Sequence, residues 1–92
     1  MYTVKPTRQY RKSLKRLLRS GSFSPEKLEA VIDTLATGKP LAPIYENHRL
    51  QGEFADYFEC HIKGNLLLMY RIDEEKNILS VIDIGSHSEL FE

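Results

Sequence analysis

The chain has 92 residues, of which 41% are hydrophobic and 28% charged, a composition typical of one folded domain that excludes an intrinsically disordered chain. No apolar run approaches the roughly 18 residues of a membrane span, and the N-terminus has no apolar core of a signal peptide. The net charge is zero and the lone Cys60 excludes an intramolecular disulfide, so we expect a single cytoplasmic domain over residues 1–92.

The N-terminal segment predicts a short strand and then a basic amphipathic helix. Residues 2–5 alternate and indicate a strand that Pro6 ends. Between Thr7 and Gly21 the apolar residues recur at helical spacing, at Tyr10, Leu14, Leu17 and Leu18. Residues 1–20 contain no acid and seven bases, namely Lys5, Arg8, Arg11, Lys12, Lys15, Arg16 and Arg19. Residues 72–92 hold six acids against Lys76, so the charge is polarised, and the helix presents either a surface for a polyanion or a solvated face.

A second amphipathic helix is predicted directly after the first. Ser24 is suited to cap it, Pro25 fits its first position, and Glu26 complements the positive end of its dipole. One apolar stripe then runs along the helix, at Leu28, Val31, Ile32 and Leu35. Gly38 and Pro40 end it. The two helices form a hairpin that needs an apolar surface to cover.

Three strand-like runs supply that surface, over residues 57–62, 66–72 and 78–84, with short polar turns between them. The predicted fold is therefore an α+β two-layer domain with an N-terminal strand, a two-helix hairpin and three antiparallel strands.

Alternation along the first run separates a core face from an outer face. Phe58, Cys60 and Ile62 form the better core set. Glu59 and His61 then lie side by side, with Tyr57, on the face away from the helices.

The candidate chemistry lies in three histidines of the second half. His48 falls in an irregular segment over residues 40–53, His61 near the end of the first hairpin strand, and His87 after Gly85-Ser86. Antiparallel pairing could bring them to one face, where histidines beside the Glu59 carboxylate make a plausible acid–base set. Taken singly, each histidine also fits a loop, strand or turn position. A three-histidine zinc site is chemically possible, although spacings of 13 and 26 residues match no compact ligand motif.

Three segments resemble the YafQ branch of the RelE/ParE toxin superfamily. They are Ile44–Gly52 with its H-x-L-x-G pattern, Glu59–Ile62 with acid-x-His, and Gly85–Phe91 with G-S-H-x-x-L-F. The resemblance covers the whole chain, including the order of the elements, and implies a RelE-like fold. It implies a toxin of a type II toxin–antitoxin system that cuts mRNA on the ribosome without a metal or other cofactor and inhibits translation. The resemblance also implies a partner, a cognate antitoxin encoded nearby.

Carried over residue by residue, the resemblance implies that His48, His61 and His87 are catalytic. Glu59 stands where the family usually has Asp, and Phe91 would position the RNA. We expect His87 to be the leading acid–base residue, with His48 or Glu59 as its counterpart and His61 stabilising or orienting the phosphate.

Other positions are expected to contact RNA. The basic helix would bind phosphates of mRNA or ribosomal RNA in a sequence-independent way, through Arg8, Arg11, Lys12, Lys15, Arg16 and Arg19. Asn65 and Leu66 depart from the family pattern, which often has an acid and an aromatic residue there; Asn65 can still orient RNA by hydrogen bonds. Tyr57 and Phe91 are candidates for stacking on bases, although ordinary packing is the better interpretation of Tyr57.

Two rival functions remain at this level. The first is a non-enzymatic toxin of the ParE type, which binds a protein target such as DNA gyrase; such a binder has no need for three proton-transfer groups. The second is an inert or purely regulatory relative, in which the changes at Asn65 and Leu66 have cost activity.

Overall fold

The computed structural model of the chain describes residues 1–21 and 23–91. Five strands form a single mixed sheet in the order β1-β5-β4-β3-β2. The helices and strands are β1 (Thr3–Pro6), α1 (Arg8–Ser20), α2 (Pro25–Ala36), β2 (His48–Arg49), β3 (Phe58–Lys63), β4 (Leu66–Asp73), β5 (Ile78–Gly85) and α3 (His87–Phe91). Two 3-10 turns, η1 (Pro43–Tyr45) and η2 (Gly52–Phe54), flank β2.

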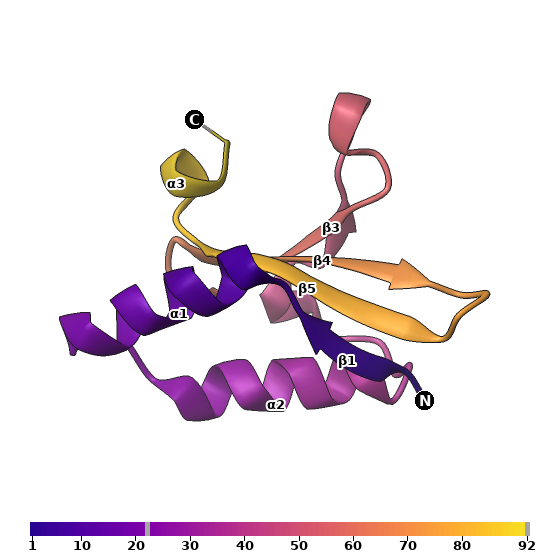
Figure 1. Ribbon diagram of the computed structural model, residues 1–92, viewed down its shortest axis with the longest axis horizontal. Helices are drawn as coiled ribbons and strands as arrows, with labels where there is room; N and C mark the ends of the chain where they lie inside the picture. Colours follow the sequence, from indigo (N-terminus) through magenta and orange to yellow (C-terminus); the bar gives the residue numbers. More distant parts are fainter. Residues whose placement is uncertain (22, 92) are drawn as a thin grey trace.

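The predicted α+β fold is confirmed. Helices α1 and α2 lie on one side of the sheet, whereas α3 and the η2 segment stand on the other, which we call the open face (Figure 1). The core lies under α1 and α2 and includes Cys60 and Ile62 of β3, with Phe58 packed against it. Glu59 and His61 alternate with these residues and so face the open side, as predicted. Within residues 1–21 and 23–91, no helix is long and apolar enough to cross a membrane.

Strand β1 pairs in parallel with β5 at the edge of the sheet. The prediction that the strand stops at Pro6 is confirmed, because Pro6 is the last residue of β1, where it pairs with Val81. Proline lacks a backbone N–H, and an edge strand tolerates that loss on its unpaired side. The ladder then continues, since the backbone N–H of Thr7 donates to the Val81 carbonyl at 3.0 Å.

Helix α1 begins at a side chain that also anchors it to the sheet. The Thr7 hydroxyl accepts a hydrogen bond from the Tyr10 N–H at 3.0 Å and donates to the Ile82 carbonyl at 2.6 Å. The helix buries Tyr10 and Ser13. The predicted place of Leu18 in the apolar stripe is wrong, because Leu18 is 50% exposed. Leu18 lies eight residues from Tyr10, where the 3.6-residue turn has already carried the side chain beyond the buried face.

Helix α2 has the predicted start and buried stripe, with Leu28, Val31 and Leu35 in the core. The capping role predicted for Ser24 is not observed, because its hydroxyl donates to the Glu26 carboxylate at 3.0 Å instead of pairing with a backbone N–H.

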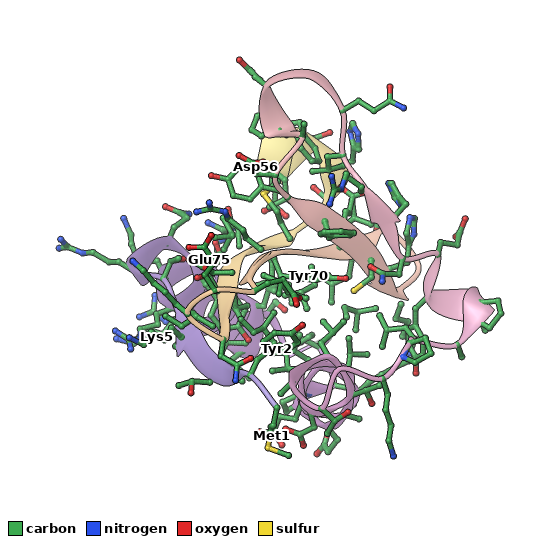
Figure 2. The ribbon with its side chains drawn as sticks, turned by 90° about the vertical axis from the view of Figure 1, so that its right-hand side faces the viewer. Met1, Tyr2, Lys5, Asp56, Tyr70 and Glu75 are labelled. Carbon is green, nitrogen blue, oxygen red and sulfur yellow. The ribbon has the colours of Figure 1, made fainter. Side chains whose placement is uncertain are left out.

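The irregular segment predicted over residues 40–53 contains a short strand. His48 and Arg49 form β2, which pairs antiparallel with β3, so His48 is a strand residue and not a loop residue. The buried Tyr70, which Figure 2 shows between the sheet and α2, donates its hydroxyl to Asn47 Oδ1 at 2.5 Å. Burial raises the pKa of Tyr70 to about 12, so this donor keeps its proton and holds the segment before β2.

The Cys60 thiol is expected to be inert in the folded protein. It is fully buried, and burial followed by the nearby Glu59 carboxylate raises its pKa to about 12. Alkylation needs the thiolate and access to it. Iodoacetamide at pH 8 should therefore leave the native protein unmodified over an hour and label it fully in denaturant, as measured by intact mass. Rapid labelling of the native protein would contradict this packing.

Candidate active site on the open face of the sheet

Two rows of paired residues cross the open face. The first row runs through β2, β3, β4 and β5, in the order His48, Glu59, Met69 and Asp83. The second row, two residues further along the strands, is His61, Leu67 and Gly85. Neighbouring strands lie about 4.8 Å apart, so the sheet places His48, Glu59 and His61 within reach of a single small ligand.

His48 and Glu59 form the centre of this site. His48 Nε2 lies 3.5 Å from Glu59 Oε1. On the other side of the ring, Nδ1 lies 2.7 Å from the Glu46 carbonyl oxygen. A carbonyl oxygen can only accept, so Nδ1 carries a hydrogen, and Nε2 is the nitrogen that can gain or release a proton. The exchangeable nitrogen therefore faces the carboxylate.

Glu59 is an unusual buried residue. Its side chain is 6% exposed, whereas that of His48 is 50% exposed. Its second oxygen, Oε2, is buried and has no hydrogen-bond partner among the described residues. An unpaired buried carboxylate oxygen opposes folding, and such groups concentrate where function requires them. The geometry thus singles out Glu59 beside His48 as a reactive pair.

Glu46 links this pair to His61, and the sequence analysis did not identify it. Its carboxylate Oε2 lies 3.7 Å from His61 Nδ1, while its carbonyl accepts from His48. Glu46 adopts a left-handed backbone with φ of 46° at the end of η1, which points its carbonyl and side chain toward two different histidines. Its position two residues before His48 was the available signal, but a left-handed glutamate is rare and cannot be predicted from sequence.

His87 belongs to a second group at the other end of the second row. It is exposed and is the first residue of α3, and its ring lies 4.9 Å from that of Phe91. Phe91 packs edge-on against Phe54, and Phe54 packs against Tyr57. Gly85, two residues before His87, is separated from His61 by one strand, or about 10 Å. The predicted single site is thus two groups on one face, not one contact cluster.

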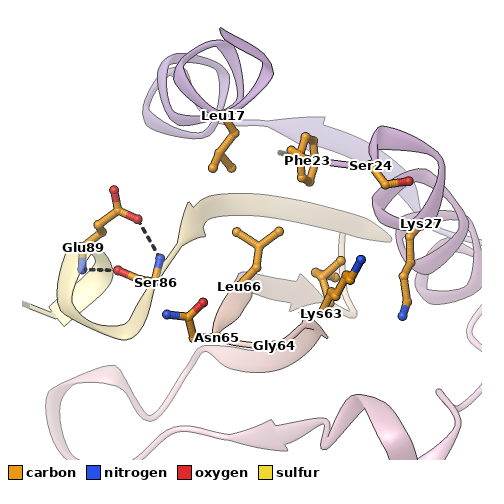
Figure 3. Close-up of a pocket in the computed structure, with 11 residues that line it drawn as sticks. Leu17, Phe23, Ser24, Lys27, Lys63, Gly64, Asn65, Leu66, Ser86 and Glu89 are labelled. Atoms are coloured by element: carbon orange, nitrogen blue, oxygen red, sulfur yellow. Dashed lines mark hydrogen bonds between the residues drawn. The ribbon is translucent and has the colours of Figure 1, made fainter. Parts of the chain in front are cut away.

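A reciprocal cap fixes the start of α3. The Glu89 N–H donates to the Ser86 hydroxyl at 3.2 Å, and the Ser86 N–H donates to Glu89 Oε1 at 2.8 Å (Figure 3). Gly85 leaves room for this carboxylate, since a Cβ there would lie 2.9 Å from Glu89 Oε1. Arg16 of α1 adds an ion pair to Glu89 at 3.2 Å. This capping box orients the helix that carries His87 and Phe91.

The other predicted RNA-contacting residues lie away from this face. Asn65 is exposed in the turn between β3 and β4 and lines a cavity of about 380 Å³ between that turn, α1 and α2 (Figure 3). Leu66 is partly buried against the core. The basic residues of α1 are exposed, as the solvated and the polyanion-binding interpretations both require: Arg8, Arg11, Lys12, Lys15, Arg16 and Arg19. In the described part of the chain, no three or more His, Cys, Asp or Glu residues are arranged to hold a metal ion.

Replacing Glu89 with alanine is expected to loosen α3 without unfolding the sheet. The Ser86 backbone N–H lowers the pKa of the Glu89 carboxyl. The stability that this carboxylate gives to α3 is therefore present above the unfolded-state pKa of about 4.3, and it is lost as the pH falls through the folded-state pKa. Losing a cap costs about 1 kcal/mol. The protection factors of the α3 amides, which correct for the intrinsic pH dependence of exchange, should fall in Glu89→Ala at pH 7, and in the unaltered protein as the pH drops below about 4.3. Unchanged protection in Glu89→Ala would contradict the role of the cap.

The sequence has clear relatives. The chain matches over residues 2–92 a family model described as YafQ, a bacterial toxin of type II toxin–antitoxin systems. The putative toxin YafQ of Haemophilus influenzae is 35% identical over 65 residues, which are 68% of this chain and 64% of that protein, slightly under two thirds of its length. The mRNA interferase toxin YafQ of Escherichia coli is 29% identical over 84 residues, which are 90% of this chain and 88% of that protein.

Solved structures share the fold over nearly its whole length. A metal-bound toxin from Helicobacter pylori is 43% identical with a TM-score of 0.92, covering 99% of this chain and 100% of that one. The E. coli DinJ–YafQ toxin–antitoxin complex gives 26% identity and a TM-score of 0.85, covering 99% of this chain and 98% of the matched chain.

Proposed function

The chain belongs to the YafQ family of bacterial toxins of type II toxin–antitoxin systems, and from that premise we propose that it is an mRNA interferase. It cleaves mRNA on the ribosome, in the cytoplasm, and so inhibits translation. The observation that carries the proposal is the buried Glu59 carboxylate on the open face, whose Oε1 faces the exchangeable nitrogen of His48 while its Oε2 has no partner among the described residues. The E. coli relative named mRNA interferase toxin supports the same activity.

The proposed reaction uses a nucleophile that RNA itself carries. The ribose 2′-oxygen attacks the adjacent phosphorus, its proton passes to a base, and the bond from phosphorus to the 5′-oxygen breaks as an acid protonates that oxygen. The products are a 2′,3′-cyclic phosphate, which hydrolyses to a 3′-phosphate, and a 5′-hydroxyl. This chemistry needs two proton-transfer groups and a cation or donor for the phosphate, and no metal.

The two groups of the open face suit these roles. The Glu59–His48 pair combines a carboxylate with a nitrogen that can take or release a proton, and we assign it one proton transfer. His87 on α3 carries out the other proton transfer. His61, two residues after Glu59 on β3 and held toward Glu46, contacts the phosphate. Phe91, whose ring lies 4.9 Å from that of His87, positions the RNA beside it.

Substrate and partner follow from the same surfaces. The exposed bases of α1 contact phosphates of ribosomal RNA or mRNA, a contact that weakens as salt rises. A cognate antitoxin encoded nearby blocks the toxin, as the family description and the DinJ–YafQ complex of the E. coli relative suggest.

One experiment separates this function from a ParE-like one. The chain is expressed briefly in growing cells, and a reporter mRNA is examined by primer extension while supercoiling by purified gyrase is assayed with the purified protein. New cleavage sites within the coding region, with unchanged supercoiling, support the proposal. Inhibited supercoiling with intact mRNA would overturn it in favour of a protein target.

A further inference from the structure

A cavity on the open face takes no part in the mechanism above, and one of its lining residues, Met69, is the strand neighbour of Glu59. Its volume is about 350 Å³, within the range of small-molecule pockets. It opens between the start of α1, strands β4 and β5, the η2 segment and α3. Its lining combines aromatic, aliphatic and polar side chains, including Phe54, Tyr57, Met69, Leu90, Gln9 and Asp83.

One carboxylate oxygen of Asp83 accepts hydrogen bonds from the protein, and the other does not. Its Oδ1 accepts from the Ser13 hydroxyl at 2.6 Å and from the Ile84 N–H at 2.8 Å. Gln9 donates to Ser13 at 3.2 Å and extends the chain of hydrogen bonds. Among the described residues, none donates to Asp83 Oδ2. Asp83 lines the cavity, and it is held in place through Oδ1 while Oδ2 stays available as an acceptor.

A bulge in β5 brings Asp83 to this face. Met69 pairs with Asp83 while Tyr70 pairs with Val81, so Ile82 is an extra residue on β5. Without it, Asp83 would share the face of Leu79 and Val81, which are buried in the core. With it, Asp83 stands in the row that runs through Met69 to Glu59, about 10 Å away. Neighbouring nucleotides of one strand can occupy the cavity and the His48–Glu59 pair together.

The aromatic side of the cavity is suited to a flat ring. Phe54 and Tyr57 are half-buried, and their ring centroids lie 6.2 Å apart. The ring centroids of Phe54 and Phe91 lie 5.5 Å apart. Single-stranded RNA is read by stacking splayed bases on aromatic side chains and by hydrogen bonds to their edges. A carboxylate repels a phosphate but accepts hydrogen bonds from the exocyclic amino group of a base.

We propose that this cavity binds one RNA base next to the scissile phosphate and that Asp83 selects bases bearing an amino group over uracil. The inference rests on the proposed RNA cleavage and adds its base preference. Tyr57 stacks on the base while Asp83 Oδ2 accepts from its amino group. Uracil has no amino group, and its N3–H lies between two carbonyl oxygens that would face the carboxylate. Adenine, cytosine and guanine are therefore accepted, and uracil is disfavoured.

The test uses the purified protein on ribosomes that carry an mRNA with a randomised coding stretch, with cleavage ends mapped by sequencing. The unaltered protein should disfavour uracil about tenfold at one position near the cut. Asp83→Asn keeps an acceptor for Ser13 and Ile84 but presents an amide donor, so the bias should fall to within about twofold at that position. Asp33→Asn, the same change on the exposed face of α2, should leave the profile unaltered.

A second variant tests the aromatic side of the cavity independently of Asp83. Tyr57→Leu should lower cleavage about tenfold for all bases, since stacking does not distinguish them. Cleavage without a uracil bias, an unchanged bias in folded Asp83→Asn, or undiminished cleavage by Tyr57→Leu would each overturn the base pocket and leave the proposed nuclease standing. Absence of any cleavage by the unaltered protein would overturn both.

Discussion

Replacing His87 with alanine is expected to lower mRNA cleavage at least 100-fold and to abolish growth inhibition. A side chain that transfers a proton in the rate-limiting step contributes about 10²–10⁴ in rate, and alanine cannot replace it. His87 is exposed at the start of α3, so its loss removes little packing. Cleavage is measured as the initial rate of full-length mRNA loss on purified ribosomes, with the circular dichroism spectrum recorded for each protein.

The matched control is Ser88→Ala, the next residue along α3, which is also exposed. An exposed substitution of this kind changes stability by less than about 0.5 kcal/mol and should leave cleavage unaltered. A folded His87→Ala protein that cleaves at the full rate would remove His87 from the mechanism.

Replacing Glu59 with glutamine is expected to move stability and activity in opposite directions. Because Glu59 Oε2 is buried without a partner, removing the negative charge removes a desolvation cost. We expect the free energy of unfolding to rise by about 1 kcal/mol, or about 4–8 °C in melting temperature for a domain of this size. Cleavage should fall about 100-fold, because a neutral amide cannot hold or exchange the proton at His48 Nε2.

The control for Glu59→Gln is Glu53→Gln on the exposed η2 turn, where the same change should alter neither quantity. Thermal unfolding and cleavage rates are measured on the same preparations. A less stable protein that keeps full activity would show that Glu59 serves the fold and not the reaction.

The elements that could be predicted from sequence are those with long periodic patterns or clear end signals. The stripe of α2, the stripe of α1 apart from Leu18 and the faces of β3 follow from spacing alone, because burial of one face dominates their energy. The start of α2 at Pro25 follows from its end signal. Strand β2 has two residues and α3 has five, too few for either period to show. Their positions depend on pairing with β3 and on the Ser86–Glu89 cap.

The sequence predicts which residues belong to the candidate site better than it predicts which of them lie together. Alternation along β3 placed Glu59 beside His61 because both lie on the face opposite Cys60. Glu46 depends on a left-handed backbone, and Asp83 on the bulge at Ile82. Both features arise from tertiary packing, and neither leaves a periodic signal in the sequence. A one-residue change of register would have moved Asp83 into the core.

The central claim, that this chain cleaves mRNA by metal-independent proton transfer on the open face, is tested most directly by the chemistry of the cut ends. Purified ribosomes carrying a defined mRNA are incubated with the protein and a chelator that removes zinc and copper but leaves magnesium. We predict fragments ending in a 2′,3′-cyclic phosphate and beginning with a 5′-hydroxyl, at a rate the chelator does not change. Intact mRNA, fragments beginning with a 5′-phosphate, or loss of cleavage with the chelator would contradict the account.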